Sequence, residues 1–151
     1  MNELAVDWNE LELAFREVSE TQNFFDLRSG AVVSVVRGYE DEAEIQTLIQ
    51  QHPDRFEKIA PLDAGFTRDA LMAFLPLVVQ KQLRAELELA LKGPAGLTRA
   101  MDVLKTHGDV MGQFHRHEQE SFWKHVNSFL GSCGVKPANR APEPELFHEV
   151  A

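Results

Sequence analysis

Apolar residues at helical spacing lie near the start of the chain. Four of them recur three or four positions apart, which places them on one face of an α-helix: Trp8, Leu11, Phe15 and Val18. Asp7 comes just before this series, and Glu10 lies three positions after Asp7. The two residues therefore resemble a capping box with Asp in place of Ser or Thr. The pattern predicts a first helix that begins after Asp7.

A stretch rich in Phe, Leu and Val comes next. It consists of two parts, residues 24–27 and residues 31–36, and Arg28, Ser29 and Gly30 lie between them. Gly30 can take the positive φ that a short hairpin loop often needs. We therefore expect two strands joined by a short turn.

A third short segment, residues 53–61, has a proline at each end. Charged and apolar side chains mix inside it, which is typical of an edge strand rather than of a buried central one. Phe56 and Ile59 need a partner to cover them, and a two-stranded ribbon alone is only marginally stable. We expect this strand, at about Phe56–Ile59, to lie beside the hairpin and to complete a three-stranded sheet.

Helical periodicity returns after the hairpin and dominates the second half of the chain. Acidic residues 40–44 favour a helix start, and Pro53 ends the helix that follows. In the second half, Pro76 either kinks one helix or begins the next. Residues 93–96 (Gly-Pro-Ala-Gly) break the pattern, and a long amphipathic helix then ends near Gly131.

These elements predict an α+β fold that is predominantly helical, with a short three-stranded sheet in the N-terminal half and a helical C-terminal part. Residues 1–136 are enough for one core and too few for two ordinary domains, so we expect a single globular domain. Residues 137–151 are proline-rich and acidic, which predicts a disordered tail. Its apolar pair, Leu146 and Phe147, would suit insertion into a partner groove.

Charge and composition narrow the classes of partner and the compartment. The formal net charge is −9, so a nucleic-acid backbone or an anionic membrane surface would be repelled. Cys133 is the only cysteine, which excludes an intramolecular disulfide and fits a reducing compartment. The first residues lack the basic and apolar regions of a secretory signal, and no apolar run approaches the length of a membrane span. We expect a cytoplasmic protein whose partner is another protein.

Histidines of the C-terminal half are the first candidates for chemistry: His107, His115, His117 and His125. No two of them have the i, i+4 spacing of a helical zinc pair, so we expect neither a metal nor another cofactor. Ser121 and His125 could form a nucleophile and base, but one helix supplies no orienting acid or oxyanion site. Cys133 follows a predicted helix C-terminus and lacks a setting that would activate a thiol.

Two other positions have alternative interpretations. Residues 93–96 could present N–H groups to an anion near Arg99, but Pro94 lacks a donor and no strand precedes it, so a helix-to-helix turn is favoured. Arg55 could pair with Glu57, with Asp26 or with an acidic partner, and a structural ion pair at the sheet edge is favoured.

Five segments, spread over most of the chain outside the tail, carry a family resemblance. They are DLRSGAVV (26–33), PDRFEKIAP (53–61), MAFLPLV (72–78), ALKGPAGLTRAMDVL (90–104) and FWKHVNSFL (122–130). In order and spacing they resemble the bacterial uncharacterised protein family 0158, which has no assigned biochemical role. The chain departs from that family at two places. Ala60 precedes Pro61, where members usually have proline directly after the strand Ile, and Leu97, Thr98 and Arg99 stand where members usually have an aromatic and a basic pair.

We expect a non-enzymatic protein-interaction or regulatory module. The alternative is a small ligand-binding domain or enzyme with a polar site between the sheet and the C-terminal helices, involving Arg55, Arg99 and His115. The candidate partner or ligand surface consists of Arg55, Phe56, Arg99 and His115. A deep polar pocket holding these side chains would favour the ligand-binding alternative, and a flat surface would favour the interaction module.

Overall fold

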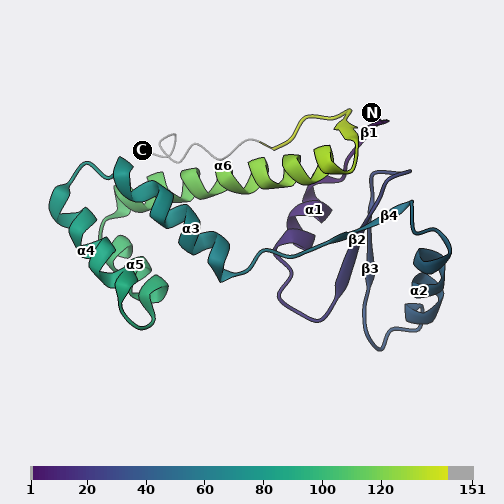
Figure 1. Cartoon of the computed structure of the whole chain (residues 1–151), viewed down its shortest axis with the longest axis horizontal. Coiled ribbons are helices and arrows are strands. Elements are labelled where there is room, and N and C mark those ends of the chain that lie inside the picture. Colours follow the sequence, from purple (N-terminus) through teal and green to yellow (C-terminus); the bar gives the residue numbers. More distant parts are fainter. Residues whose placement is uncertain (1, 143–151) are drawn as a thin grey trace. The chain divides into compact units, whose positions relative to one another are not determined.

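The computed structural model describes residues 2–142, which form two compact units (Figure 1). Unit 1 contains residues 2–63 and 123–142, and unit 2 contains residues 64–122. The fold is α+β and mostly helical, as the sequence predicts. The single domain expected over residues 1–136 stays a prediction, because the structure defines each unit by itself.

Unit 1 contains the predicted three-stranded antiparallel sheet. Its strands are β2 (Gln22–Asp26), β3 (Val32–Val35) and β4 (Phe56–Ile59), in the order β3-β2-β4. Phe24 of β2 lies opposite Val33 of β3 on one side and opposite Lys58 of β4 on the other. The hairpin and the edge position of Phe56–Ile59 are thereby confirmed.

Gly30 explains why the hairpin turns where it does. Its φ is +78°, in the left-handed region that side chains with a Cβ rarely adopt, and its N–H donates to the Asp26 carbonyl at 2.8 Å. A Cβ at this position would lie 1.9 Å from the carbonyl oxygen of Ala5, which passes directly beside the turn. Both the conformation and the available space therefore require glycine.

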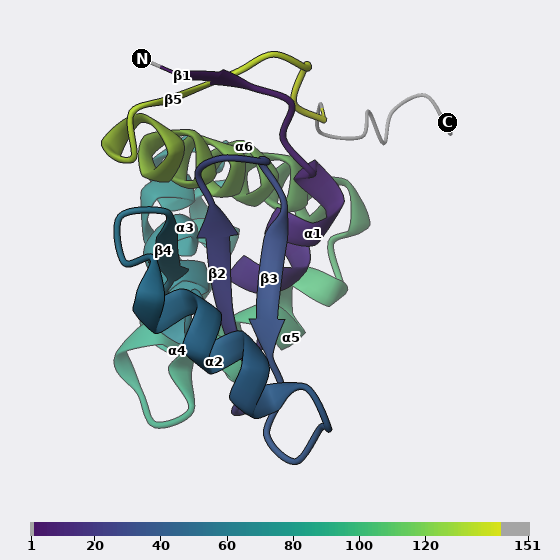
Figure 2. The ribbon, with the colours of Figure 1, turned by 90° about the vertical axis from the view of Figure 1, so that its right-hand side faces the viewer.

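Helices cover both faces of this sheet (Figure 2). α2 (Glu42–Gln51) lies on one face, while α1 (Trp8–Phe15) and residues 123–132 of α6 (Gly108–Ser132) lie on the other. The aromatic core is on the α1 side, where the Phe129 ring stands edge-on to Phe15 at 5.4 Å and to Phe25 at 6.2 Å between centroids. Asp7 caps α1 as predicted, because its side chain accepts a hydrogen bond from the Glu10 N–H.

A second, two-stranded sheet in unit 1 was not predicted. β1 (Asn2–Leu4) pairs in parallel with β5 (Val135–Pro137), and the Ala138 N–H donates to the Leu4 carbonyl at 2.6 Å. The Asn139 side chain then accepts from the Val6 N–H and donates to the Val6 carbonyl, each at 2.7 Å. Residues 137–139, where the sequence predicts disorder, thus pair with Leu4 and Val6: Pro137 and Ala138 through their backbones, and Asn139 through its side chain. Residues 143–151, with the predicted Leu146–Phe147 pair, lie outside the described residues.

Unit 2 is helical: α3 (Ala64–Phe74), the 3-10 helix η1 (Leu75–Leu77), α4 (Lys81–Lys92), α5 (Gly96–Lys105) and residues 108–122 of α6. Pro76 lies within η1, so it separates two helices rather than kinking one. The core includes Leu71, Phe74, Leu87, Leu104 and Phe114. Residues 93–96 form the predicted helix-to-helix turn, and Gly96 is needed there because a Cβ would lie 2.6 Å from the Leu91 carbonyl oxygen.

Candidate functional site

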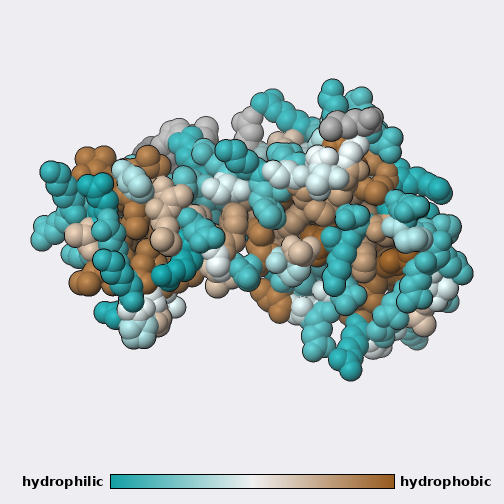
Figure 3. All heavy atoms as spheres, viewed as in Figure 1, coloured by the Kyte–Doolittle hydropathy of each residue, from teal (hydrophilic) through white to brown (hydrophobic). Residues whose placement is uncertain are grey.

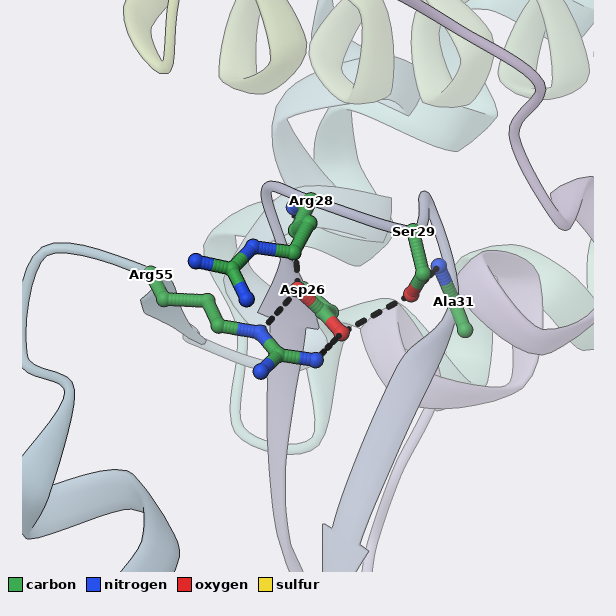
Figure 4. A network of polar contacts seen from close by, with 5 residues as sticks. All are labelled: Asp26, Arg28, Ser29, Ala31 and Arg55. Carbon is green, nitrogen blue, oxygen red and sulfur yellow. Dashed lines mark hydrogen bonds and ion pairs between the residues drawn. The ribbon is translucent and has the colours of Figure 1, made fainter.

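The buried carboxylate of Asp26 is the most highly connected polar group of unit 1 that the structure shows (Figure 4). Oδ1 accepts hydrogen bonds from Arg55 Nε and from the Arg28 backbone N–H, both at 2.9 Å. Oδ2 accepts from Arg55 Nη2 and from the Ser29 hydroxyl, both at 2.8 Å. Asp26 is only 4% exposed, so these four donors replace the water that a carboxylate would otherwise bind.

These contacts fix the charge state of the pair. The hydrogen bonds from Arg55 hold the pKa of Asp26 far below its usual range, and the Arg28 N–H and the Ser29 hydroxyl act in the same direction against the opposing effect of burial. Asp26 in turn raises the pKa of Arg55. A carboxylate that is ionised at every physiological pH and has no acceptor position left over is unsuited to general acid or base chemistry. The Asp26 carboxylate therefore acts as the structural partner of Arg55, and a structural ion pair was the favoured interpretation of Arg55.

The same pair connects two loops, and we call it the Asp26–Arg55 clamp. The Arg55 guanidinium lies over the Phe56 ring, 4.9 Å from its centroid. The Arg55 carbonyl accepts from the Leu27 N–H at 2.8 Å, and the Arg55 N–H donates to the His52 carbonyl at 3.0 Å. Backbone and side-chain bonds thus join the α2–β4 loop to the β2–β3 hairpin loop.

A cavity of about 440 Å³ lies where these two loops meet. Arg28 lines it from the hairpin loop, and His52, Asp54 and Arg55 line it from the α2–β4 loop. A second cavity of unit 1, of about 640 Å³, lies beside the start of α1 and is lined by Trp8, among other residues. The Trp8 indole N–H is buried and has no hydrogen-bond partner among residues 2–142.

The four predicted surface residues belong to different units. Arg55 and Phe56 are in unit 1, where Phe56 is a core residue with 5% exposure. Arg99 and His115 are in unit 2, where Arg99 is exposed on α5 and the half-buried His115 ring lies 6.1 Å from Phe114. A common surface or site made of these residues stays a prediction.

The histidines of α6 lie against aromatic rings rather than against one another. His117 packs on Phe74 and His125 on Phe15, each with ring centroids 5.6 Å apart. In the part of the chain that the structure describes, no three His, Cys, Asp or Glu side chains are grouped closely enough to hold a metal ion. The half-buried Cys133 has a pKa raised by burial, with the Glu57 charge acting in the same direction and a hydrogen bond from Ser132 opposing it. Its thiolate is disfavoured, as its sequence setting suggested.

Exposed apolar side chains mark a second candidate region, in unit 2. Leu77 is 60% exposed and Val79 is 92% exposed, on either side of the buried Val78, and we call these two residues the apolar connector because they link η1 to α4. Met72 of α3 is 52% exposed as well. Sequence reasoning missed the apolar connector because an uninterrupted apolar run resembles a core segment. It also missed the Arg28 side chain, whose position depends on the folded hairpin loop.

Comparison of the chain with protein-family models, with curated proteins and with solved structures gives no match. The search for membrane spans likewise finds, over residues 2–142, no helix with the length and apolar character needed to cross a bilayer.

Proposed function

We propose that the protein is a non-enzymatic protein-interaction module that binds another protein through the apolar connector. The observation that carries the proposal is the exposure of Leu77 and Val79 at the junction between two helices. Apolar residues gather at the surface of unit 2 around the connection between α3 and α4 (Figure 3). Burial of such side chains in a partner stabilises a complex by about 1.5–3 kcal/mol for each fully covered residue.

Backbone geometry and charge support the same surface. Val78 and Gln80 have extended backbones, with φ of −75° and ψ of 115° and 110°, so Leu77 ends η1 and Val79 lies in the short non-helical segment that follows. Residues 64–122 contain seven Lys or Arg and seven Asp or Glu, so the net charge of −9 resides elsewhere in the chain. A unit with no net charge and an exposed apolar segment suits a partner that presents apolar side chains more than one that binds by charge attraction.

Two assignments accompany this proposal. The resemblance of five segments to the bacterial uncharacterised protein family 0158 supports membership of that family. A cytoplasmic location is supported by the single cysteine, which fits a reducing compartment.

Site-specific photocrosslinking tests the proposed interaction. A photoreactive residue at position 79 should trap a defined partner, whereas the same residue at position 18 should not, although Val18 is 98% exposed. Purified partner should then bind the double variant Leu77→Asp and Val79→Asp at least about tenfold more weakly, and Val18→Asp with unchanged affinity. Circular dichroism of each variant verifies that its helices are retained.

Three results would contradict the proposal: equal trapping at positions 18 and 79, equal affinity of the double variant, or trapping of a second copy of the chain alone. The last result would make the apolar connector a self-association surface.

A further inference from the structure

We propose that the 440 Å³ cavity between the β2–β3 hairpin loop and the α2–β4 loop binds the oxyanion group, phosphate or carboxylate, of a small polar molecule. This site lies wholly within unit 1 and is independent of the proposed protein-binding surface of unit 2. Its volume falls within the range of about 300–1,000 Å³ that is typical of small-molecule sites.

The donors that line the cavity suit an oxyanion. Arg28 and Arg55 both border it, and Figure 4 shows the Arg28 side chain extending toward Arg55. Within the described chain, no side chain hydrogen-bonds to the Arg28 guanidinium or forms an ion pair with it. The hydrogen bond between Arg28 and Asp26 uses only the Arg28 backbone N–H. A planar guanidinium with its N–H groups unused is the side chain best matched to a carboxylate or phosphate.

Arg55 adds a second, immobile guanidinium. Two of its N–H groups are bound by Asp26, its side chain is 28% exposed, and the remaining N–H groups have no acceptor among residues 2–142. The His52 ring and the Gln51 amide border the same cavity and can also donate hydrogen bonds. The cavity therefore combines two guanidinium groups, one of them held by Asp26, with two further side chains that can donate hydrogen bonds.

The walls of the cavity are held in place before any ligand arrives. The Asp26–Arg55 clamp joins the two loops, and the Leu27 N–H to Arg55 carbonyl bond joins their backbones at 2.8 Å. The Arg55 N–H to His52 carbonyl bond closes the turn that carries His52 and Asp54. A ligand would need to order the exposed side chains of Arg28, Gln51 and His52 but not the two loops, which lowers the entropy cost of binding.

The negative charge at the start of α2 does not prevent an anion from binding in the 440 Å³ cavity. The acidic residues 40–44 lie at the N-terminal end of α2, whereas Gln51 and His52 lie at its C-terminal end, about 14 Å away at 1.5 Å per residue. That separation exceeds the screening length of about 8 Å at physiological ionic strength. Among the described residues, Asp54 is the one acidic side chain that lines the cavity, and it must weaken anion binding.

Titration of the full chain with inorganic phosphate and, separately, with malonate tests the site by amide NMR at constant ionic strength. Saturating shifts are expected at the amides of residues 27–29, 51, 52, 54 and 55. Arg28→Gln should weaken binding about tenfold, because it removes a charge-assisted hydrogen-bonding fork. Asp54→Asn should strengthen it about threefold, because it removes a like charge at the cavity. The probe that saturates at the lower concentration identifies the group as phosphate or carboxylate.

Arg37→Gln is the matched control, since Arg37 is an exposed arginine of the same unit whose ion pair with Glu20 lies at the surface. It should leave the affinity unchanged. Shifts that stay linear throughout both titrations, or equal responses of the Arg28→Gln and Arg37→Gln proteins, would overturn the proposal. Arg55 is left unchanged, because its loss would break the Asp26–Arg55 clamp and disturb both loops.

Discussion

Arg55 and Asp26 lie 29 positions apart in the chain and form a two-pronged ion pair, with Nε and Nη2 at 2.9 and 2.8 Å from the two carboxylate oxygens. Arg55 is the last residue before β4, and Asp26 is the last residue of β2. The pair therefore fixes the point at which the edge strand joins the sheet.

Replacing Asp26 should destabilise unit 1 in a pH-dependent way. Asp26→Ala removes a buried acceptor of four hydrogen bonds and should lower the free energy of unfolding by about 2 kcal/mol at neutral pH. Because the folded-state pKa of Asp26 lies below its unfolded value, the stabilisation is complete above an unfolded pKa of about 3.9 and declines at lower pH. Urea unfolding of both proteins from pH 7 down to pH 3 measures the difference.

The exposed Asp54 in the neighbouring loop is the control for this prediction, and Asp54→Ala should change stability little. Glu17 also has a lowered pKa, through hydrogen bonds from Ser19 and Asn23, so the wild-type profile alone would combine two groups. A stability difference between wild type and Asp26→Ala that stays constant from pH 7 to pH 3 would show that the ion pair is not its source.

Gly30→Ala should be far more damaging than Gly38→Ala. Both glycines have positive φ, +78° and +88°, so both substitutions incur a conformational cost of about 1–2 kcal/mol. Only at position 30 does the new Cβ also meet backbone, 1.9 Å from the Ala5 carbonyl oxygen, while nothing lies within 4 Å at position 38. Thermal unfolding should give a clearly lower midpoint for Gly30→Ala, and equal midpoints would disprove the close approach of Ala5.

Asn139→Ala should destabilise unit 1 although Asn139 lies in a stretch whose composition suggests disorder. It removes the two hydrogen bonds to the Val6 backbone, which together contribute about 1–3 kcal/mol. Asn9→Ala is the control, because this exposed side chain makes no hydrogen bond within the described chain. Equal unfolding midpoints for the two variants would mean that residues near 139 do not dock on unit 1.

Cys133 should react slowly with alkylating reagents in the folded protein. Burial raises the pKa of its thiol, so less thiolate is present near pH 8 than in an unfolded chain. Iodoacetamide should modify the folded protein at least about threefold more slowly than the same protein in urea. A faster reaction in the folded state would point to an activating group near the thiol.

Local chemistry was enough to predict much of the fold. The Gly30 turn, the prolines around β4 and the break at residues 93–96 each depend on backbone preferences that a single residue type imposes, and all three appear where expected. The pairing of β1 with β5 could not be predicted, because two three-residue strands carry no alternation and gain their partners only in the folded chain.

The candidate sites were predicted only in part, because some of their features also arise only in the folded chain. An ion pair of Arg55 at the sheet edge was predicted with Glu57, Asp26 or an acidic partner as alternatives, and the structure shows the pair with Asp26. The role of Arg28 depends on a loop conformation that the Asp26 side chain organises through the Arg28 and Ser29 donors. The exposure of Leu77 and Val79 depends on how η1 leaves α3, which apolar periodicity does not determine.

The pairing of β1 with β5 also sets the order in which the chain can assemble during synthesis. Val6 and Asn139, which close this part of unit 1, are 133 positions apart, whereas the described residues of unit 2 form one continuous segment between them. On the ribosome, residues 64–122 emerge complete while unit 1 still lacks its last strand and the Phe129 ring of its core. Translation therefore has to reach residue 139 before unit 1 can close, although β1 is made before any part of unit 2.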